Sequence, residues 1–274
     1  MSLNDSDPIS NLYRYLNRNS LQQRYDYSNA LYFAPPKTMN SKELKQLDKL
    51  IENFCTPEWR KLAWVNTTTI EVSQGELIFR EGDRAENIYM VKHGRIKVYS
   101  NYTPEIESIV RFATDGQIIG HRGFGEDFTF SVSAVALSES SIFVLPMALF
   151  QSLLKANNLF CYYIMLFFTE ELKRSERASK LKLNATVKER VAQAIRMNME
   201  NFGFDSEDEN LLAFTLTRKD MASIASTTYE SVIRSLADLQ KDGIIKIENK
   251  QLRITDKETL CSITHCSQEF SQEN

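Results

Sequence analysis

The spacing of apolar residues changes twice along this chain, and each change predicts a different kind of structure. After Trp64 and as far as Pro146, short runs of apolar and polar residues are separated by turn-forming pairs such as Gln74-Gly75. Many short strands with regular turns are typical of antiparallel barrels and rolls. We therefore predict an antiparallel β-roll for this segment, preceded by a helix that begins at Ser41.

Helical spacing follows the predicted roll. Pro146 precedes a short predicted helix, and a longer helix begins near Asn158 with ten consecutive apolar residues, 159–168. A helical segment without a polar side must be covered on all sides, and this one is too short to cross a bilayer. We expect the roll to cover one side and the same helix of a second subunit to cover the other, which makes the protein a homodimer. The alternative is a helix buried within one large core.

A third pattern occupies the C-terminal part of the chain. Residues 216–247, LTRKDMASIASTTYESVIRSLADLQKDGIIKI, predict two short helices broken at residues 225–227 and followed by a strand. Thr217 and Thr227 are the expected N-caps, because an acidic residue follows each of them three positions later. The residues after Gly243 alternate around a Glu-Asn-Lys turn, which predicts a hairpin. The second helix has its expected buried stripe at Val232, Leu236 and Leu239.

These elements together predict a winged helix-turn-helix, whose second helix enters the major groove of DNA. Tyr229, Glu230, Ile233 and Arg234 lie off the buried stripe of that helix. Arginine and glutamate supply the donors and acceptors that guanine and cytosine edges require. Two other interpretations stay open: Glu230 closes a capping box at Thr227, and Arg234 forms a surface ion pair with Glu230.

Composition and charge narrow the class of protein. With 42% hydrophobic and 25% charged residues, the 274-residue chain is typical of globular proteins and long enough for two domains. The formal net charge of −3 gives no general attraction to nucleic acid, so binding to phosphates needs a local basic face. Residues 211–253 hold seven Lys and Arg against five Asp and Glu. Four scattered cysteines and the lack of an apolar signal core or membrane span predict a cytoplasmic protein without membrane contact.

Three stretches of the sequence resemble the Crp–Fnr superfamily of bacterial transcription regulators. They are GELIFREGDRAENIYMVKHGRIKVY, the apolar helix from Leu159, and LTRKDMASIASTTYESVIRSL, and the resemblance covers Ser41 to about Leu260. It implies an α+β fold with a cyclic-nucleotide-binding-like jelly roll, a long dimerisation helix and a C-terminal winged helix-turn-helix. The expected domains are an N-terminal extension 1–40, the roll 41–156, the dimerisation helix 157–183, the DNA-binding domain 184–260 and a polar tail 261–274.

The resemblance also implies roles for residues of the helix-turn-helix. Arg218 would contact a phosphate at the start of the first helix, and the DNA-binding residues of the second are Thr228, Tyr229, Glu230 and Arg234. The family often has Arg where this chain has Tyr229, so the base preference is expected to differ. Ser226 stands where glycine is common at the turn, so this turn has to close without glycine's freedom.

The cyclic-nucleotide ligands of the family are missing from the roll. In the stretch GQIIGHRGFGEDFTFSVSAVAL, His121 falls where the family's ribose-binding Glu would be, and Val132-Ser133 fall where Arg-Ser/Thr would hold the phosphate. We therefore expect no control by cyclic AMP, and a pocket that is empty, filled by side chains or adapted to another ligand. An altered effector site would use Gly120, His121, Arg122, Glu126 and Ser133. The alternative is that Arg122 and Glu126 pair with each other or cap a loop.

Other sensors and metal sites find little support. An iron–sulfur sensor needs several N-terminal cysteines, and Cys55 stands alone there. His93 and His121 are the candidate haem ligands, although a lone histidine in a turn is more often structural. His265 with Cys261 and Cys266 is a weak zinc signal that we interpret as part of a polar tail.

The sequence therefore predicts a sequence-specific, homodimeric DNA-binding transcription regulator, with no enzymatic activity, cofactor or metal. Its expected DNA site is near-palindromic, and RNA polymerase and an unidentified small-molecule effector are further candidate partners. Two alternatives stay open. One is a metal enzyme on the roll, which three histidines in the whole chain barely supply. The other is a small-molecule-binding module that acts through protein partners.

Overall fold

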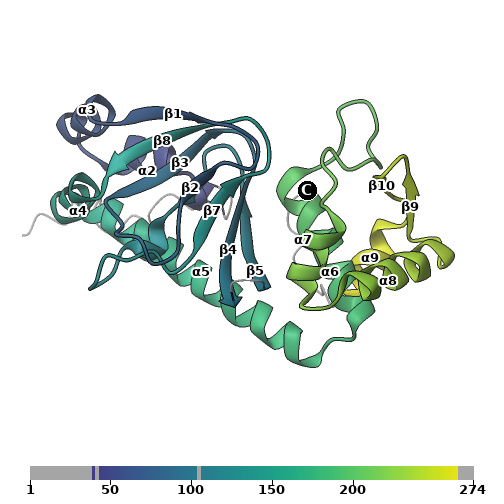
Figure 1. Ribbon diagram of the computed structural model, residues 1–274. Helices are drawn as coiled ribbons and strands as arrows, with labels where there is room; N and C mark the ends of the chain where they lie inside the picture. The colour runs from purple at the N-terminus through teal and green to yellow at the C-terminus, as the bar shows by residue number, and fades with distance from the viewer. Residues whose placement is uncertain (1–38, 41–42, 104–105, 265–274) are drawn as a thin grey trace, which may run out of the picture. The chain divides into compact units, whose positions relative to one another are not determined.

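The computed structural model describes residues 39–40, 43–103 and 106–264 (Figure 1). The tyrosine-rich N-terminal extension, apart from its last two residues, lies outside this described part. His265 and Cys266, which are two of the three residues in the weak zinc signal, also lie outside it.

The helical segment before the roll is described from Glu43 onward. A short 3-10 helix, η2 (Glu43–Lys45), precedes α2 (Leu47–Phe54) and α3 (Pro57–Val65). The α-helix begins at Leu47, because Gln46 has extended backbone angles and forms an antiparallel bridge with Gln117; the predicted start at Ser41 lies outside the described residues. Leu44, Leu47, Leu50 and Ile51 of this segment are buried, and Phe54 is half-buried.

Eight strands form the predicted roll as two four-stranded antiparallel sheets. One sheet has the order β1-β8-β3-β6 and the other β2-β7-β4-β5, so neighbouring strands are often distant in sequence. The alternating pattern and the turn glycines therefore predicted the right architecture. The strands are β1 (Thr68–Val72), β2 (Leu77–Phe79), β3 (Asn87–His93), β4 (Ile96–Thr103), β5 (Ile106–Ala113), β6 (Ile118–Ile119), β7 (Ser133–Ala136) and β8 (Ser140–Pro146).

One turn of the roll depends on a glycine. Gly94, between β3 and β4, has φ +122°, a conformation that other residues rarely adopt. A Cβ at this position would lie 2.1 Å from Oγ and 2.9 Å from Cα of Ser140. The β3–β4 turn therefore approaches the start of β8 closely because Gly94 has no side chain.

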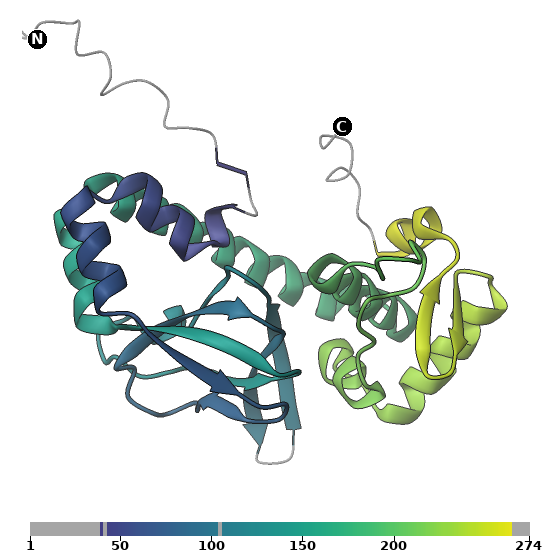
Figure 2. The same cartoon turned by 90° about the horizontal axis from the view of Figure 1, so that it is seen from above.

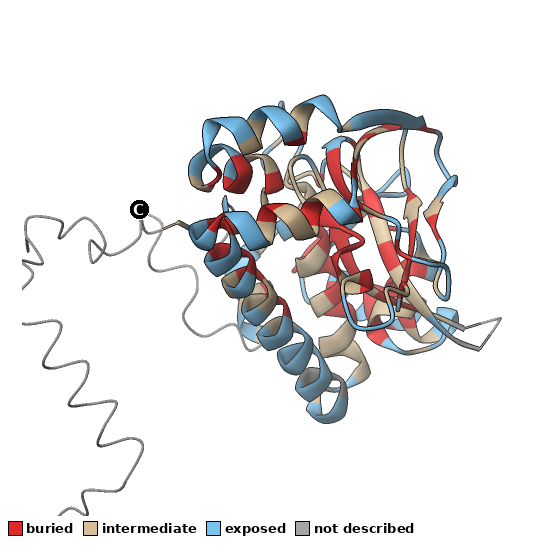
Figure 3. Cartoon of the chain, turned by 90° about the vertical axis from the view of Figure 1, so that its left-hand side faces the viewer, coloured by how far each residue is buried: buried red, intermediate tan, exposed pale blue. Residues whose placement is uncertain are grey.

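Two helices follow the roll, as predicted. They are α4 (Met147–Ala156) and α5 (Asn158–Asn184). Helices α2, α3, α4 and the first half of α5 lie beside the sheets (Figure 2). Phe160, Tyr163, Ile164 and Phe167 face the chain's own core, whereas other apolar residues of α5 are exposed. Buried positions gather in the strands and on single faces of the helices (Figure 3).

The C-terminal part consists of helices around a small hairpin. Its elements are α6 (Val187–Phe202), α7 (Arg218–Ala225), α8 (Tyr229–Lys241), β9 (Ile245–Glu248), β10 (Gln251–Ile254) and α9 (Lys257–Ile263). Val191, Ile195, Met221, Leu239 and Leu252 belong to one buried cluster that joins these elements. Helix α9 continues through Ile263 and Thr264 is buried, so an ordered helix extends into the segment expected to be a polar tail.

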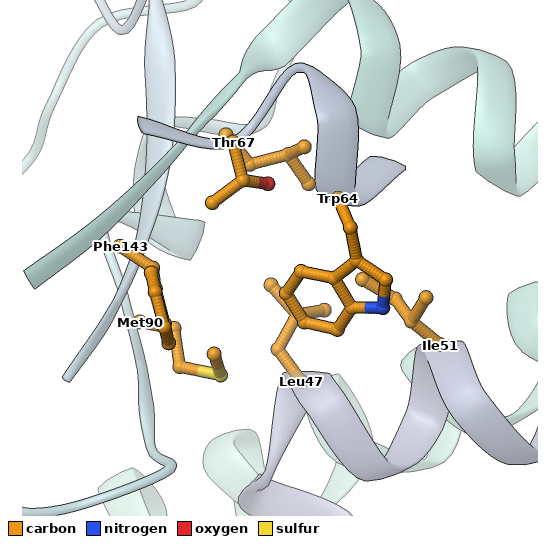
Figure 4. Close-up of a pocket in the computed structure, with 7 residues that line it drawn as sticks. Leu47, Ile51, Trp64, Thr67, Met90 and Phe143 are labelled. Atoms are coloured by element: carbon orange, nitrogen blue, oxygen red, sulfur yellow. The ribbon is translucent and has the colours of Figure 1, made fainter. Parts of the chain in front are cut away.

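A small apolar cavity lies between the helical segment and the roll (Figure 4). Side chains of Leu47 and Trp64 face those of Met90 and Phe143 across it. Its volume is about 10 Å³, which is the space for a single water molecule at most. It is therefore a packing gap rather than a ligand site.

Candidate nucleic-acid interface

The two helices of the predicted motif begin at threonine caps. Thr217 Oγ1 accepts a hydrogen bond from the Asp220 backbone N–H at 3.0 Å and caps α7, as the sequence predicts. The cap of α8 is Thr228, which accepts from the Ser231 backbone N–H at 3.3 Å. The predicted cap at Thr227 is wrong by one residue, because the chain needs one more residue to leave the preceding turn.

The turn between α7 and α8 closes through a left-handed serine. Ser226 has φ 46° and ψ 56°, angles that glycine adopts more easily. Its backbone N–H and that of Thr227 bond to carbonyls in the last turn of α7. The turn therefore closes at a conformational cost that a glycine at this position would not carry.

Helix α8 separates buried and exposed residues as the sequence predicts. Val232, Leu236 and Leu239 are buried in the C-terminal core. On the other face, the exposed fractions of Tyr229 and Ile233 are 53% and 43%, unusually high for large apolar side chains. The exposed residues line one open depression on the surface, formed by Thr228, Tyr229, Glu230, Ile233 and Arg234.

The charged residues on this face make hydrogen bonds within the start of α8. Hydrogen bonds from the backbone at Glu230 and from the Thr228 side chain hold the pKa of the Glu230 carboxyl below its usual value, so it is ionised at neutral pH. Arg234 Nη2 donates to Ser231 Oγ at 3.2 Å. Both side chains are described, and no ion pair within 4 Å joins them, so the surface-pair interpretation is not supported.

The remaining elements of the motif flank this face. Arg218 is the first residue of α7 and is half-buried. The hairpin β9–β10 turns at Asn249 and Lys250, which both have positive φ, as a tight two-residue turn requires. The predicted wing is therefore present, with exposed lysines at positions 246 and 250.

Strands of the roll contact the first helix of the motif. Lys97 Nζ on β4 lies 3.0 Å from Glu107 Oε2 and 3.2 Å from Asp220 Oδ1. Burial would lower the pKa of Lys97, but these two carboxylates outweigh it and raise the pKa. Ser223 Oγ also donates to the Glu107 carbonyl at 2.7 Å. Charged and neutral hydrogen bonds thus join β4 and β5 to α7.

The effector residues predicted in the roll do not form one site. Gly120 has φ 77° and precedes a 3-10 turn, η3 (His121–Gly123), in which His121 is buried. Ser133 is buried and accepts a hydrogen bond from the Glu81 backbone N–H at 2.9 Å. Glu126 is exposed. The predicted pair of Arg122 with Glu126 is not observed between these two described residues, so that interpretation is not supported.

Aromatic side chains fill the interior of the roll. The rings of Phe79 and Phe130 stack with centroids 4.2 Å apart, and Tyr89 stacks on Phe79 at 5.4 Å. A Cβ at Gly120 would lie 2.9 Å from the Tyr89 ring. Side chains thus occupy the inside of the roll, which is one of the three expected alternatives.

His121 faces the long helix. Its Nε2 lies 3.6 Å from Glu171 Oε2, and its ring packs edge-on against Phe167 at 4.9 Å. Sequence reasoning missed Glu171, because it lies in a charged run of α5 that looked solvent-exposed. Its burial depends on contacts with residues 50 or more positions earlier in the chain.

The described residues contain neither a group of metal ligands nor a membrane-spanning helix. No group of three or more His, Cys, Asp and Glu side chains there is arranged to hold a metal ion. Cys55 and Cys161 are free thiols. Over the same part of the chain, no helix combines the length and apolarity needed to cross a membrane.

Comparison with known proteins agrees with this arrangement of roll, long helix and winged helix-turn-helix. The family model of the cyclic nucleotide-binding domain matches residues 69–157, and that of the Crp-like helix-turn-helix domain matches residues 189–263. The chain belongs to the Crp–Fnr superfamily. This family consists of DNA-binding transcription regulators rather than enzymes.

Named members of the Crp–Fnr superfamily resemble the chain over most of its length. Electron transport regulator A of Shewanella oneidensis is 28% identical over 225 residues, 82% of this chain and 84% of that protein. The fumarate and nitrate reduction regulatory protein of Escherichia coli is 25% identical over 228 residues, covering 83% and 85%.

Solved structures of the superfamily share the fold. FixK2 from Bradyrhizobium japonicum aligns with a TM-score of 0.64 at 20% identity, covering 72% of this chain and 96% of its own. A CooA variant from Carboxydothermus hydrogenoformans gives 0.60 at 18% identity, covering 73% and 88%.

Proposed function

We propose that this protein is a homodimeric transcription regulator that reads DNA sequence with α8. The observation that carries the proposal is the exposed face of that helix. Its first two turns present an ionised carboxylate, a guanidinium and two large apolar side chains next to one another. A helix-turn-helix places these turns in the major groove.

Each exposed side chain of α8 has a matching chemistry in that groove. Arg234 suits the two acceptors of guanine, and Glu230 suits the amino group of cytosine. Tyr229 and Ile233 suit thymine, because its methyl group is the apolar feature of the major groove. We assign phosphate contacts to Arg218 and Thr228, which lie at the N-termini of α7 and α8.

The homodimer is supported by the uncovered face of α5. Tyr162, Met165, Thr169 and Leu172 follow the 3-4-3 spacing of a coiled-coil seam, and all four are exposed in the single chain. Phe160, Tyr163, Ile164 and Phe167 of the same helix are buried within the chain instead. A second copy of α5 would cover this seam and give the protein two reading helices, as a near-palindromic site requires.

The proposed regulator acts in the cytoplasm, with RNA polymerase as a further partner. Cyclic AMP is not its signal under this proposal. The filled roll interior and the His121 position support this, because both charged ligands of the nucleotide-binding members are missing.

Selection of bound DNA from a random pool tests the function directly. We expect a near-palindromic motif with half-sites about one helical turn apart, and binding that weakens steeply with salt. Absence of an enriched motif would refute DNA reading and favour a module that acts through protein partners.

Three variants then separate base reading from phosphate contact. Arg234→Ala should cost about 1–3 kcal/mol on the selected site and relax the preference at one base pair. Arg218→Ala should weaken selected and random DNA alike and reduce the salt dependence by about one phosphate contact. Replacing the selected thymines by uracil should weaken DNA binding by the wild type. The same replacement should weaken DNA binding by the variant Ile233→Ala less. Equal losses on selected and random DNA for Arg234→Ala would contradict base reading.

A further inference from the structure

Several cationic side chains surround one buried carboxylate, that of Glu171 on α5. Arg111 on β5 donates from Nη1 to Glu171 Oε2 at 3.1 Å, and Arg174 pairs with the other carboxylate oxygen. His121 Nε2 lies 3.6 Å from Oε2, beyond hydrogen-bond distance. Glu171, Arg111 and His121 are all buried. We call these residues, with Lys45 and Arg122, the Glu171 cluster.

Lys45 and Arg122 bring more positive charge to the cluster than it can neutralise. Both side chains are half-buried, and within the described part of the chain neither has an ion pair or a side-chain hydrogen bond. Both act electrostatically on the same partners, Arg111 and Glu171. The cluster therefore holds four permanent or near-permanent cations against one carboxylate.

Neighbouring carboxylates do not restore the balance. Glu170 acts on Arg174, and Glu200 acts on Lys45, each from farther away. Glu170 is paired with Lys173 at 2.7 Å, and Glu200 with Arg196 at 2.8 Å. These two carboxylates thus belong to other ion pairs.

Burial, with neighbouring cations adding to it, lowers the pKa values of Lys45 and Arg122. Burial, together with Arg174 and Arg111, lowers the pKa of Lys45 to about 8. Burial lowers the pKa of Arg122 as well. Arg111 lowers it further, whereas Glu171 raises it. A cation that finds enough negative charge has a raised pKa instead, as Lys97 does.

The buried imidazole points to the same deficit. His121 is 4% exposed, and within the described structure neither ring nitrogen has a hydrogen-bond partner. Buried polar atoms are rarely left without one. An added acceptor beside His121 would satisfy the ring and offset the cations at the same time.

We propose that the Glu171 cluster binds a small oxyanion that carries two or more negative charges, held by Lys45, Arg111, Arg122 and Arg174. Guanidinium groups match both phosphate and carboxylate oxygens with paired hydrogen bonds, and the ammonium of Lys45 adds a mobile donor. The charge excess favours a dianion over chloride or another monovalent ion. A phosphate group and a dicarboxylate share this chemistry.

A ligand at the cluster would contact the helix that leads to the C-terminal part of the chain. Glu171 and Arg174 belong to α5, which ends at Asn184 just before the helices of the DNA-reading part. The ligand site stands apart from the interior of the roll, where aromatic rings lie. The inference concerns ligand binding alone and does not require that the protein binds DNA.

Calorimetric titration of the full-length protein tests the site. The probes are inorganic pyrophosphate and succinate, with ionic strength held constant by chloride. We expect one saturable site per chain for at least one probe. Lys45→Gln and Arg122→Gln should each weaken it about tenfold or more, as loss of one charged hydrogen bond does. The matched variants Lys49→Gln and Arg80→Gln remove exposed cations and should leave the affinity unchanged.

The binding results distinguish a phosphate-bearing ligand from a dicarboxylate, and both from the absence of a site. Binding of pyrophosphate alone indicates a phosphate-bearing ligand, and binding of succinate alone indicates a dicarboxylate. No saturable binding of either probe, or equal losses in all four variants, overturns the proposal. Thermal unfolding in chloride gives a second test: Lys45→Gln should unfold at the same or a higher temperature than the wild type. A lower temperature would contradict the excess of positive charge.

Discussion

Replacing Glu171 by Gln probes a buried ion pair between β5 and α5. The change keeps the shape of the side chain and removes the charge that faces Arg111 and His121. Arg111 stays in place because it also donates to the Ile118 carbonyl at 3.1 Å. Its cation is then buried without a counter-charge. The folded roll should therefore lose stability while the unfolded chain is little affected.

The expected loss follows from burial. Breaking a buried pair by removing one partner costs about 3–5 kcal/mol, because it leaves an uncompensated charge. A glutamine oxygen still accepts one hydrogen bond from Arg111, so we expect about 3 kcal/mol. The Arg174 side chain is 36% exposed, and its pair with Glu171 adds less than about 1 kcal/mol.

Urea unfolding followed by tryptophan fluorescence measures this loss. Both tryptophans of the chain, Trp59 and Trp64, lie in α3, so the signal reports the roll rather than the DNA-reading part. A loss of about 3 kcal/mol moves the midpoint down by about 1 M urea. Glu170→Gln is the matched control, because its pair with Lys173 is more exposed, and it should change the free energy of unfolding by under about 0.5 kcal/mol. Equal effects of the two variants would refute the reasoning.

Three further predictions concern pH, backbone and assembly. Burial lowers the pKa of His121 from 6.5 to about 4, so on acidification the unfolded chain binds a proton that the folded chain does not. His121 should therefore contribute a fall of about 3 kcal/mol in the free energy of unfolding between pH 6.5 and 4, and His121→Gln should make the pH dependence in urea titrations shallower by about that amount. Gly94→Ala places a Cβ against Ser140 in a strained conformation, and its melting temperature should drop by several degrees. Leu172→Glu should convert the dimer to a monomer in analytical ultracentrifugation, and an unchanged mass would contradict the α5 seam.

The local pattern of the sequence was enough for most of the elements. Alternation and turn glycines predicted the strands of the roll, and helical spacing predicted α4, α5, α7 and α8. The exposed face of α8 was also predictable, because Val232, Leu236 and Leu239 specify the buried side and leave Tyr229 and Arg234 on the other. In each case the information lies within one turn or one strand of the residue concerned.

The tertiary structure decided what depends on residues far apart in the chain. Helix α2 starts at Leu47 because Gln46 is drawn into a bridge with Gln117, a contact that no local pattern contains. Glu171 has the sequence surroundings of an exposed helix residue, yet it is buried against Arg111 and His121. Periodicity records which side chains are apolar, and it assigns charged ones to solvent by default. Whether a charge is instead buried depends on which distant partners the folded chain brings to it, and only the packed structure supplies them.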